Sequence, residues 1–352
     1  MKKIMILILL STLMVACSSS NSNNGIDLPS LDSEWSIPVS EVLDGGPGRD
    51  GIPALVNPQL VSASEAGFIE DEDLVILFKN GDDVRAYPHI ILDWHEIINE
   101  NVGDVSLAIT FCPLTGTGIG WGRIINGNET TFGVSGLLYN TNLIPFDRET
   151  QSNWSQILNE SVNGELLGRP AELYQLWETN WATAKQMYPN VDVVGTDTGF
   201  SRTYGTSPYG NYNTNNDLFF FPVSKDGRLP LKEKVLAILD DTAKVYRFTD
   251  FLDTNLIRDT FNGKEYLLIG NEDFMFSYSL TGDLSGLEFN YVLGDNPERP
   301  DIVMEDNEGN LWNVFGEAVS GPREGQIIST SNAMMAQWFS IPAFYETEIY
   351  NR

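Results

Sequence analysis

Short apolar stretches, separated by Gly, Asn and Asp, recur along the whole chain. Such stretches run from Leu74 to Phe78, from Val105 to Phe111, from Val235 to Leu239 and from Tyr266 to Ile269. Apolar runs of this length between turn-forming residues are typical of β-strands. Two segments, Pro88 to Asn99 and Glu178 to Tyr188, have helical spacing instead. The pattern predicts a β-rich α+β fold with few helices.

The sequence also contains two similar halves. The segment LVILFKNGDDVRAYPHIIL (74–92) matches VLAILDDTAKVYRFTDFL (235–252), and DRETQSNWSQILNESVNGELLG (147–168) matches EDNEGNLWNVFGEAVSGPREGQ (305–326). Because order and spacing are both kept, we predict an internal duplication, each half being mainly antiparallel strands with one or two short helices. Several tryptophans recur with the repeat and are therefore predicted to lie in the core: Trp154, Trp177, Trp181, Trp312 and Trp338.

The repeat divides the chain into a first half (31–200), a linker loop (201–217) and a second half (218–352) that is a degenerate copy. The linker, SRTYGTSPYGNYNTNND, is rich in Gly, Tyr and Asn. Loops of this length are often functional, so the linker is either a lid or a long ordered loop. The second half contains no His and no Cys. Any chemistry that uses these residues is therefore expected in the first half.

The helix predicted from Pro88 to Asn99 carries both histidines of the chain. One face of this helix is apolar and would face the core. His95 lies at the edge of this face, whereas His89 projects from the opposite, polar face. One unbroken helix therefore does not present the two histidines as a chelating pair, unless the helix begins after His89.

The strand predicted from Val105 to Cys112 alternates between larger apolar residues and small residues. Cys112 ends this strand on the small-residue face, just before Pro113 and a Gly-containing turn. Small neighbours leave room for a ligand or for a closely packed helix. A buried, inert cysteine is the alternative.

The first 16 residues have the pattern of an export signal. Lys2 and Lys3 precede an apolar run from Ile4 to Leu10, far shorter than the roughly 20 residues that cross a bilayer. The ending from Leu13 to Cys17 resembles the lipobox of bacterial lipoproteins. Residues 1–16 are accordingly expected to be a signal peptide.

Cys17 is expected to be the first residue of the mature chain and to carry a lipid such as palmitate. Residues 17–30 then form a polar tether that holds the folded part away from the membrane. The predicted location is the cell envelope, with the lipid as the contact to the membrane. If the cell is Gram-negative, Ser18 after the cysteine, in place of Asp, indicates the outer membrane, facing the periplasm or the exterior.

A formal net charge of −28 makes nucleic acid an implausible partner, since its phosphates would be repelled. The charge predicts a solvated acidic surface and identifies neither a reaction nor a protein partner. With Cys17 lipidated, Cys112 is the one thiol left in the folded part, so an internal disulfide cannot form.

Four segments carry a resemblance to a known family: RAYPHIILDWHEIIN (85–99), TFCPLTGTGIGW (110–121), TFGVSGLLYNTNLIPFDRETQSNWSQ (131–156) and RTYGTSPYGNY (202–212). With these motifs the chain resembles the bacterial and archaeal domain-of-unknown-function family 3179 (DUF3179). The resemblance implies no established activity. It implies that His95-Glu96 and Cys112-Pro113-Leu114 belong to the recognisable core. Relatives often have a second cysteine where this chain has Thr115, and its absence argues against a redox pair here.

Three functions remain open from the sequence. The first is a metal site for copper or zinc, with Cys112 and His95 as ligands and His89 or Glu96 as a third. The second is a thiol enzyme in which Cys112 is the nucleophile, His95 lowers its pKa and Glu96 or another acid orients the imidazole. The third is an interaction or structural module in which Cys112 is simply packed. The first two require His95 and Cys112 to lie within a few ångströms of each other.

Weaker signals concern three further residues that are predicted as pocket residues. Ser135 lies in Gly133-Val134-Ser135-Gly136, which is not a complete nucleophile elbow because Leu137 occupies the final glycine position. Asp147-Arg148 is either a structural ion pair or turn, or a pocket wall that contacts an anionic group.

Overall fold

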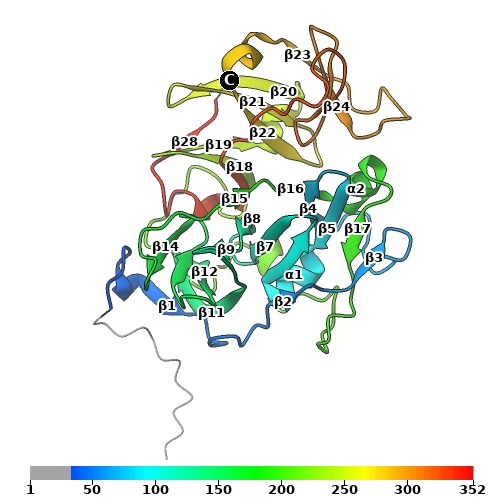
Figure 1. The fold of residues 1–352 in the computed structure, drawn as a ribbon. Helices are drawn as coiled ribbons and strands as arrows, with labels where there is room; N and C mark the ends of the chain where they lie inside the picture. Colours follow the sequence, from blue (N-terminus) through cyan, green and yellow to red (C-terminus); the bar gives the residue numbers. More distant parts are fainter. Residues whose placement is uncertain (1–32, 352) are drawn as a thin grey trace, which may run out of the picture.

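The computed structural model describes residues 33–351, which form mainly β-strands in several sheets (Figure 1). This part of the chain contains two short α-helices, α1 (His89–His95) and α2 (Trp181–Met187). It also contains single 3₁₀ turns: η1 (Val39–Glu41), η2 (Tyr212–Thr214), η3 (Phe248–Phe251), η4 (Gly282–Gly286) and η5 (Trp338–Ser340). The prediction of a β-rich α+β fold is confirmed. The predicted signal peptide, Cys17 and the tether lie outside the described residues.

The first half contains three larger sheets and one two-stranded ladder. The strands of the first sheet are, in spatial order, β1 (Val42–Asp44), β11 (Phe132–Tyr139), β12 (Asn142–Asp147), β13 (Asn153–Ser155) and β14 (Glu160–Asn163). Those of the second sheet are β15 (Leu173–Tyr174), β8 (Thr117–Gly122), β7 (Val105–Cys112), β6 (Ile97–Val102) and β2 (Leu55–Val56). Those of the third sheet are β16 (Trp177–Asn180), β4 (Leu74–Asn80), β5 (Asp83–Pro88), β17 (Asp192–Val194) and β3 (Leu60–Ser62). The ladder pairs β9 (Ile124–Ile125) with β10 (Asn128–Glu129).

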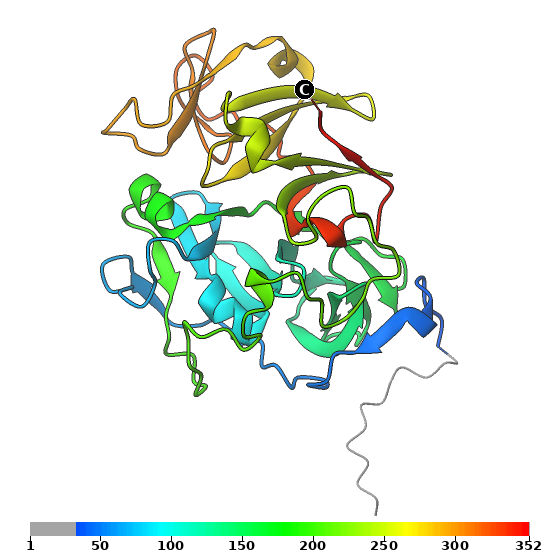
Figure 2. The ribbon, with the colours of Figure 1, turned by 180° about the vertical axis from the view of Figure 1, so that it is seen from behind.

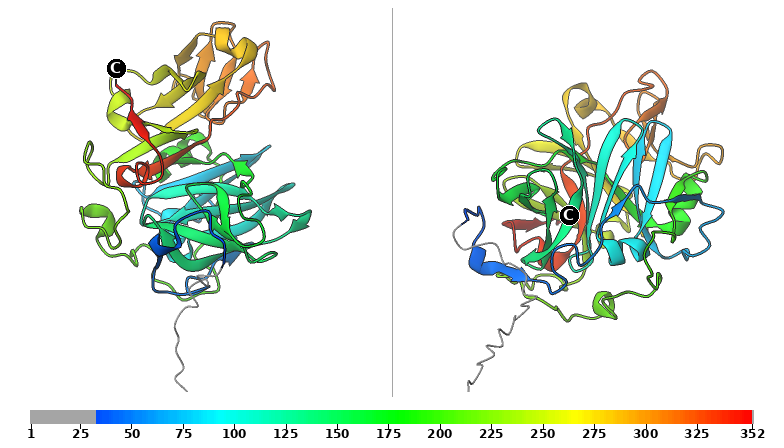
Figure 3. Two further views of the ribbon diagram at one scale, coloured as in Figure 1. Left: turned by 90° about the vertical axis from the view of Figure 1, so that its left-hand side faces the viewer. Right: turned by 60° about the horizontal axis from the view of Figure 1, so that its bottom comes forward.

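The second half also contains three sheets. The strands of the first of them are, in spatial order, β27 (Ala333–Gln337), β18 (Lys234–Leu239), β19 (Ala243–Arg247) and β28 (Thr347–Ile349). The next sheet contains β20 (Leu256–Phe261), β21 (Lys264–Gly270) and β22 (Met275–Leu280). The last contains β23 (Phe289–Tyr291), β24 (Ile302–Asp306), β25 (Leu311–Asn313) and β26 (Ala318–Ser320). The second half lies against one side of the first, as the side view in Figure 3 shows.

The two halves share a pattern of strand pairing. The hairpin β4–β5 has β16 antiparallel beside β4 and β17 parallel beside β5. The hairpin β18–β19 has β27 antiparallel beside β18 and β28 parallel beside β19. After β16 the chain enters α2 at Trp181, and after β27 it enters η5 at Trp338. The corresponding strands therefore occur in the same order in both halves.

The two tryptophan turns also have the same local contact. The indole of Trp154 donates a 2.9 Å hydrogen bond to the Asp147 carboxylate, and the indole of Trp312 donates one of 2.9 Å to Asp306. Both tryptophans follow an irregularity in the strand ladder. These contacts support the internal duplication, which stays a prediction.

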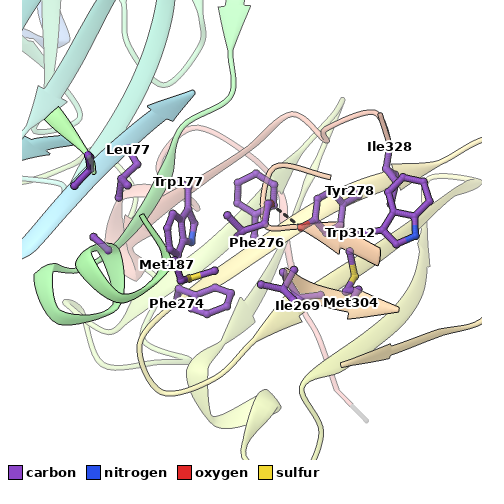
Figure 4. Close-up of a cluster of buried hydrophobic side chains, with 14 of the residues drawn as sticks. Leu77, Trp177, Met187, Ile269, Phe274, Phe276, Tyr278, Met304, Trp312 and Ile328 are labelled. Atoms are coloured by element: carbon purple, nitrogen blue, oxygen red, sulfur yellow. Dashed lines mark hydrogen bonds between the residues drawn. The ribbon is translucent and has the colours of Figure 1, made fainter. Parts of the chain in front are cut away.

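One hydrophobic core contains side chains from both halves (Figure 4). Trp177 of β16 lies edge-on to Phe274, with ring centroids 5.4 Å apart. The repeated tryptophans are all at most 2% exposed, which confirms that they are core residues: Trp154, Trp177, Trp181, Trp312 and Trp338. Because the halves bury apolar surface against each other, they form one packed body. Among residues 33–351, no helix is both long and apolar enough for a membrane span.

Both predicted helices are shorter than expected. The first ends at His95, because Glu96 adopts a left-handed conformation (φ 56°) and Ile97 begins β6. The second begins at Trp181, and Asn180 caps it by accepting a 2.8 Å hydrogen bond from the Thr183 backbone N–H. The residues before it, predicted as helix, form β16. β-branched and aromatic residues near both boundaries fit a strand at least as well as a helix.

The predicted alternation of the strand ending at Cys112 is confirmed in β7. Leu107, Ile109 and Phe111 pack into one hydrophobic cluster, whereas Ala108 and Cys112 pack into another. Both faces of this strand are therefore buried, and Cys112 lies between packed layers.

The linker 201–217 is an ordered loop in this structure. It follows β17 and crosses the first half on the side seen in Figure 2, where it is coloured green to yellow-green. The loop is attached to α1, because the Trp94 indole donates a 3.1 Å hydrogen bond to the Thr206 carbonyl.

Candidate functional site

A cavity of about 500 Å³ lies beside the C-terminal end of α1. It is lined by the loop after β1, the end of α1, the turn after β7, strands β11 and β12, and the loop after β17. Most of its wall is apolar, from Ile52, Leu114, Val134, Leu137, Leu138, Leu143, Phe219 and Phe220. Cavities of this size and character accept small organic ligands.

Glu96 is the most deeply buried polar side chain in the cavity wall, with 7% of its surface exposed. Its backbone N–H bonds to the Leu92 carbonyl (2.7 Å) and its own carbonyl accepts from Phe111 (2.7 Å). The residue therefore ends α1 and at once joins the sheet edge at β7. A non-glycine residue with a left-handed backbone is uncommon, and here it directs the chain from the helix into β6.

The Glu96 carboxyl has one hydrogen-bond donor, the Tyr209 hydroxyl, 2.8 Å from Oε1. Burial raises the pKa of Glu96 to about 7, an effect that the Tyr209 hydrogen bond opposes and the nearby Asp93 carboxylate reinforces. Near neutral pH this carboxyl can therefore change its charge when its surroundings change.

Asp93 is a second acid in the same wall, one turn earlier in α1. Burial raises its pKa to about 7 as well, and a hydrogen bond from Ser207 opposes the shift. Perturbed carboxyl groups in a cleft are typical of functional sites, although buried structural acids show such shifts too.

Cys112 is not part of the cavity wall. Its side chain is 2% exposed, and Sγ donates to the Thr141 carbonyl at 3.7 Å. Burial raises the pKa of the thiol to about 11, and the charge of Glu96 adds to this effect. The thiol is therefore protonated at neutral pH, whereas a nucleophile or a metal ligand needs the thiolate.

His95, at the end of α1, is occupied by two hydrogen bonds. Nδ1 lies 2.7 Å from the Pro53 carbonyl and Nε2 lies 2.7 Å from the Tyr204 hydroxyl. Since a carbonyl oxygen only accepts, Nδ1 carries the proton and Nε2 accepts from Tyr204. Burial lowers the pKa of His95, so the ring is neutral at pH 7. These contacts join His95 to two loops, and neither of them involves Cys112.

His89 lies at the opposite end of α1. Its Nε2 is 3.4 Å from a Glu178 carboxylate oxygen, and its ring packs 4.4 Å from the ring of Phe111. Among residues 33–351, no group of three or more His, Cys, Asp or Glu side chains is arranged to hold a metal ion. The predicted copper or zinc site of His95, Cys112 and His89 therefore has no support in the geometry. His89 and His95, the first and last residues of α1, contact different parts of the protein.

A model of a family described as proteins of unknown function, DUF3179, matches residues 49–348. The chain belongs to the DUF3179 family. No curated protein and no solved structure matches it.

The four DUF3179-like segments, of which the last lies well beyond the other three in the sequence, meet at the cavity. Segment 85–99 contributes Glu96, segment 110–121 contributes Leu114, segment 131–156 contributes Leu143, and segment 202–212 contributes Tyr209. One cavity thus collects residues from every motif on which the resemblance rests.

The three weaker candidates of this DUF3179 chain do not line the cavity. Asp147 is fully buried and accepts hydrogen bonds from the Thr150 N–H (2.6 Å) and from Trp154. Arg148 pairs with Asp50 at 2.5 Å, and not with Asp147 as the adjacent positions suggested. The Ser135 hydroxyl bonds within the β11–β12 ladder. Each of the three stabilises local structure.

A buried network of amides and hydroxyls, which the sequence did not reveal, supports the turn after Cys112. Asn142 Nδ2 donates to Gln156 Oε1 (2.7 Å) and to the Thr115 hydroxyl (3.0 Å). Gln156 Nε2 donates in turn to the Thr110 carbonyl (3.0 Å). Thr115 supplies a hydroxyl to this network and no thiol, so Cys112 has no resolving partner in the motif.

Sequence reasoning also missed Asp93, Arg202 and Tyr209, which all line the cavity. Tyr209 lies 113 positions from its partner Glu96, on a loop without periodicity. The Gly- and Tyr-rich composition of the linker was the one signal that pointed to this segment.

Proposed function

We propose that this DUF3179 protein is a binding protein that takes a small organic molecule into the cavity beside α1. The observation that carries the proposal is the convergence of all four motif segments on one largely apolar cavity that contains Glu96 and Asp93. An apolar wall with few polar groups is the usual composition of a ligand site, in which the polar groups fix the orientation of the ligand.

The geometry favours this function over the two chemical functions predicted from the sequence. The thiol of Cys112 is buried and protonated, and His95 is bonded to Pro53 and Tyr204. A thiol enzyme would need both groups to be rearranged before reaction. The interaction module stays a prediction.

A neutral, environment-sensitive dye such as Nile red tests the proposal. We expect saturable binding of one dye per chain, detected by fluorescence. Leu114 lines the cavity and is 6% exposed, so Leu114→Trp should fill part of the space and weaken binding by about tenfold or more. Leu252→Trp, at a site 73% exposed, is the matched control and should leave binding unchanged.

Circular dichroism of both variants shows whether they are folded. If Leu114→Trp is folded and binds the dye as the wild type does, the dye occupies another site. Absence of any saturable binding contradicts the proposal directly.

We also propose that the protein acts in the cell envelope, held to the membrane by a lipid on Cys17. The lipobox-like ending of the signal segment supports this location. Replacement of Cys17 by Ser should move the protein from the membrane fraction to the soluble fraction. A variant that stays fully membrane-bound would rule out the lipid anchor.

A further inference from the structure

We infer that the ligand of this cavity is an organic cation, an ammonium group on an apolar body, with its charge against the Glu96 carboxylate. This inference rests on the proposed function and adds the chemical class of the ligand. It depends on the position of Glu96 in the cavity wall and on the partners that this residue lacks.

Among residues 33–351, no basic side chain pairs with Glu96. Its Oε1 accepts from Tyr209, and no described residue donates a hydrogen bond to Oε2. Glu96 is more than nine-tenths buried and is part of the cavity wall, so a ligand in the cavity would lie against this residue. A buried carboxylate without a counter-ion is costly, and a cation in the cavity would offset that cost.

The other buried glutamates of the described chain provide an internal comparison. Glu100, 2% exposed, is bound by Arg85, and Glu178, 9% exposed, is bound by Lys234. In both places the protein supplies the base itself. Glu96 lies instead in the wall of the cavity, so a ligand in the cavity could take the place that Arg85 and Lys234 have beside the other two glutamates.

Aromatic residues in the cavity wall suit the same ligand. Trp94, Tyr209 and Phe219 all contribute to the cavity wall. The faces of such rings attract cations, most strongly when the cation has lost its water. The aliphatic part of the wall, which includes Leu138 and Leu143, would contact the apolar body of the ligand.

Other charged and titratable groups around Glu96 are consistent with a cationic ligand. Asp93 on the same helix is acidic, and Tyr209 on the loop and Cys112 at the end of β7 are neutral at pH 7. Among the described residues that line the cavity, Arg202 is the one basic residue. Its guanidinium lies 5.7 Å from the Trp94 ring, and it is not among the charges that shift the pKa of Glu96. An anionic ligand held by Arg202 is the competing outcome of the test.

Three probes with one apolar body and different charges provide the test: (2-naphthylmethyl)trimethylammonium, 2-naphthalenemethanol and 2-naphthoate. Calorimetric titration at pH 8 should show the ammonium binding about tenfold or more tightly than the alcohol, and the naphthoate weakest. A cation binds best to ionised Glu96, so its affinity should fall by about tenfold or more between pH 7.5 and pH 5.5. The affinity of the alcohol should change little over the same range.

Two variants and one control test whether the preference for the ammonium probe depends on the Glu96 carboxyl. Glu96→Gln should abolish the tenfold preference for the ammonium and retain binding of the alcohol. Glu65→Gln, on an exposed turn, is the control and should keep the preference. Asp93→Asn should reduce the preference less than Glu96→Gln does, and it provides a second measurement if Glu96→Gln does not fold.

The outcomes separate this inference from the proposed function. If the alcohol or the naphthoate binds at least as tightly as the ammonium, the cation inference is overturned and the binding function stands. If none of the three probes binds the folded protein, both are overturned.

Discussion

The Tyr209 hydroxyl donates a 2.8 Å hydrogen bond to Glu96 and thereby joins the linker loop to the turn that ends α1. The bond crosses the cavity wall between two segments that the sequence separates by 113 positions. It fixes one carboxyl oxygen of a residue that is part of the cavity wall. Several consequences of this and related contacts can be measured.

The first prediction concerns the pH dependence of stability. The pKa of Glu96 is raised from 4.5 to about 7 in the folded state, so the folded protein holds this proton more tightly than the unfolded chain. The stability that this group contributes is present below pH 4.5 and is lost as the pH rises through 7. Glu96→Gln should therefore match the wild type near pH 4.5 and be more stable at pH 8, by about 2 to 3 kcal/mol.

Urea unfolding of both proteins at several pH values measures this difference. Groups remote from Glu96 titrate in the same way in both proteins and cancel in the comparison, whereas Asp93 is coupled to Glu96, so Asp93→Asn is measured beside it. Parallel stability curves for the two proteins would mean that Glu96 has an ordinary pKa.

The second prediction concerns the thiol of Cys112, tested in protein that carries Cys17→Ser. Because burial raises its pKa to about 11, the folded protein should react with Ellman's reagent at least about a hundredfold more slowly than the urea-unfolded chain at pH 8. Cys112→Ala should retain Nile red binding. Rapid reaction of the folded protein, together with loss of binding in the alanine variant, would restore the thiol-enzyme hypothesis.

The third prediction concerns the contact between Glu178 of β16 and Lys234 of β18. Burial opposes ionisation of Glu178, but the charge of Lys234 and the contact with His89 lower its pKa to about 2. Burial lowers the pKa of His89 itself, so its ring is neutral at pH 7 and Lys234 is the balancing ion. Glu178→Gln should cost about 3 kcal/mol at pH 7, since it removes a buried carboxylate whose ionised form is stabilised and leaves the partly buried Lys234 ammonium unpaired.

This stabilisation is present above pH 4.5 and is lost as the pH falls through 2, so wild type and variant should converge in acid. Asp240→Asn, which removes an exposed pair with Lys264, is the control and should cost less than about 1 kcal/mol. An equally small effect of Glu178→Gln would show that the buried pair does not join the halves.

The fourth prediction tests the internal duplication through its two tryptophan turns. Asp147→Ala and Asp306→Ala each remove the acceptor of a buried indole N–H. Each should destabilise the protein by about 2 to 4 kcal/mol, because the donor is left unsatisfied. Equilibrium unfolding should give two similar values, and a clear loss in one variant with no effect in the other would contradict equivalent roles.

Local patterns predicted most of the strands, because apolar runs and turn residues report burial and chain reversal directly. The alternation that places Cys112 with Ala108, and the burial of Trp154 and Trp312, followed from sequence alone. The helix ends were wrong where Ile97 and Ile98 satisfy both a helical face and a strand. There the pairing of β6 with β7 decides the structure, and this pairing is a tertiary effect.

The candidate site was harder to predict than the fold. Glu96 was predicted as a third metal ligand or as the acid that orients the His95 imidazole, whereas its hydrogen-bond partner in the structure is Tyr209. No spacing rule links a helix end to a loop more than a hundred residues later. The protonation of Cys112 depends on burial in three dimensions, which a lone cysteine in a sequence does not report.

Trp177 of the first half packs against Phe274 of the second half. The two halves are therefore associated as two subunits of a complex are, but the backbone joins them. The half without histidine or cysteine supplies strands and aromatic rings that complete the hydrophobic interior of the other. A backbone cut within 201–217 should therefore leave two fragments that stay associated, whereas either fragment expressed alone would expose its half of the interface to water. The second half thus acts as a covalently attached partner of the first, and it also contributes Phe219 and Phe220 to the cavity wall.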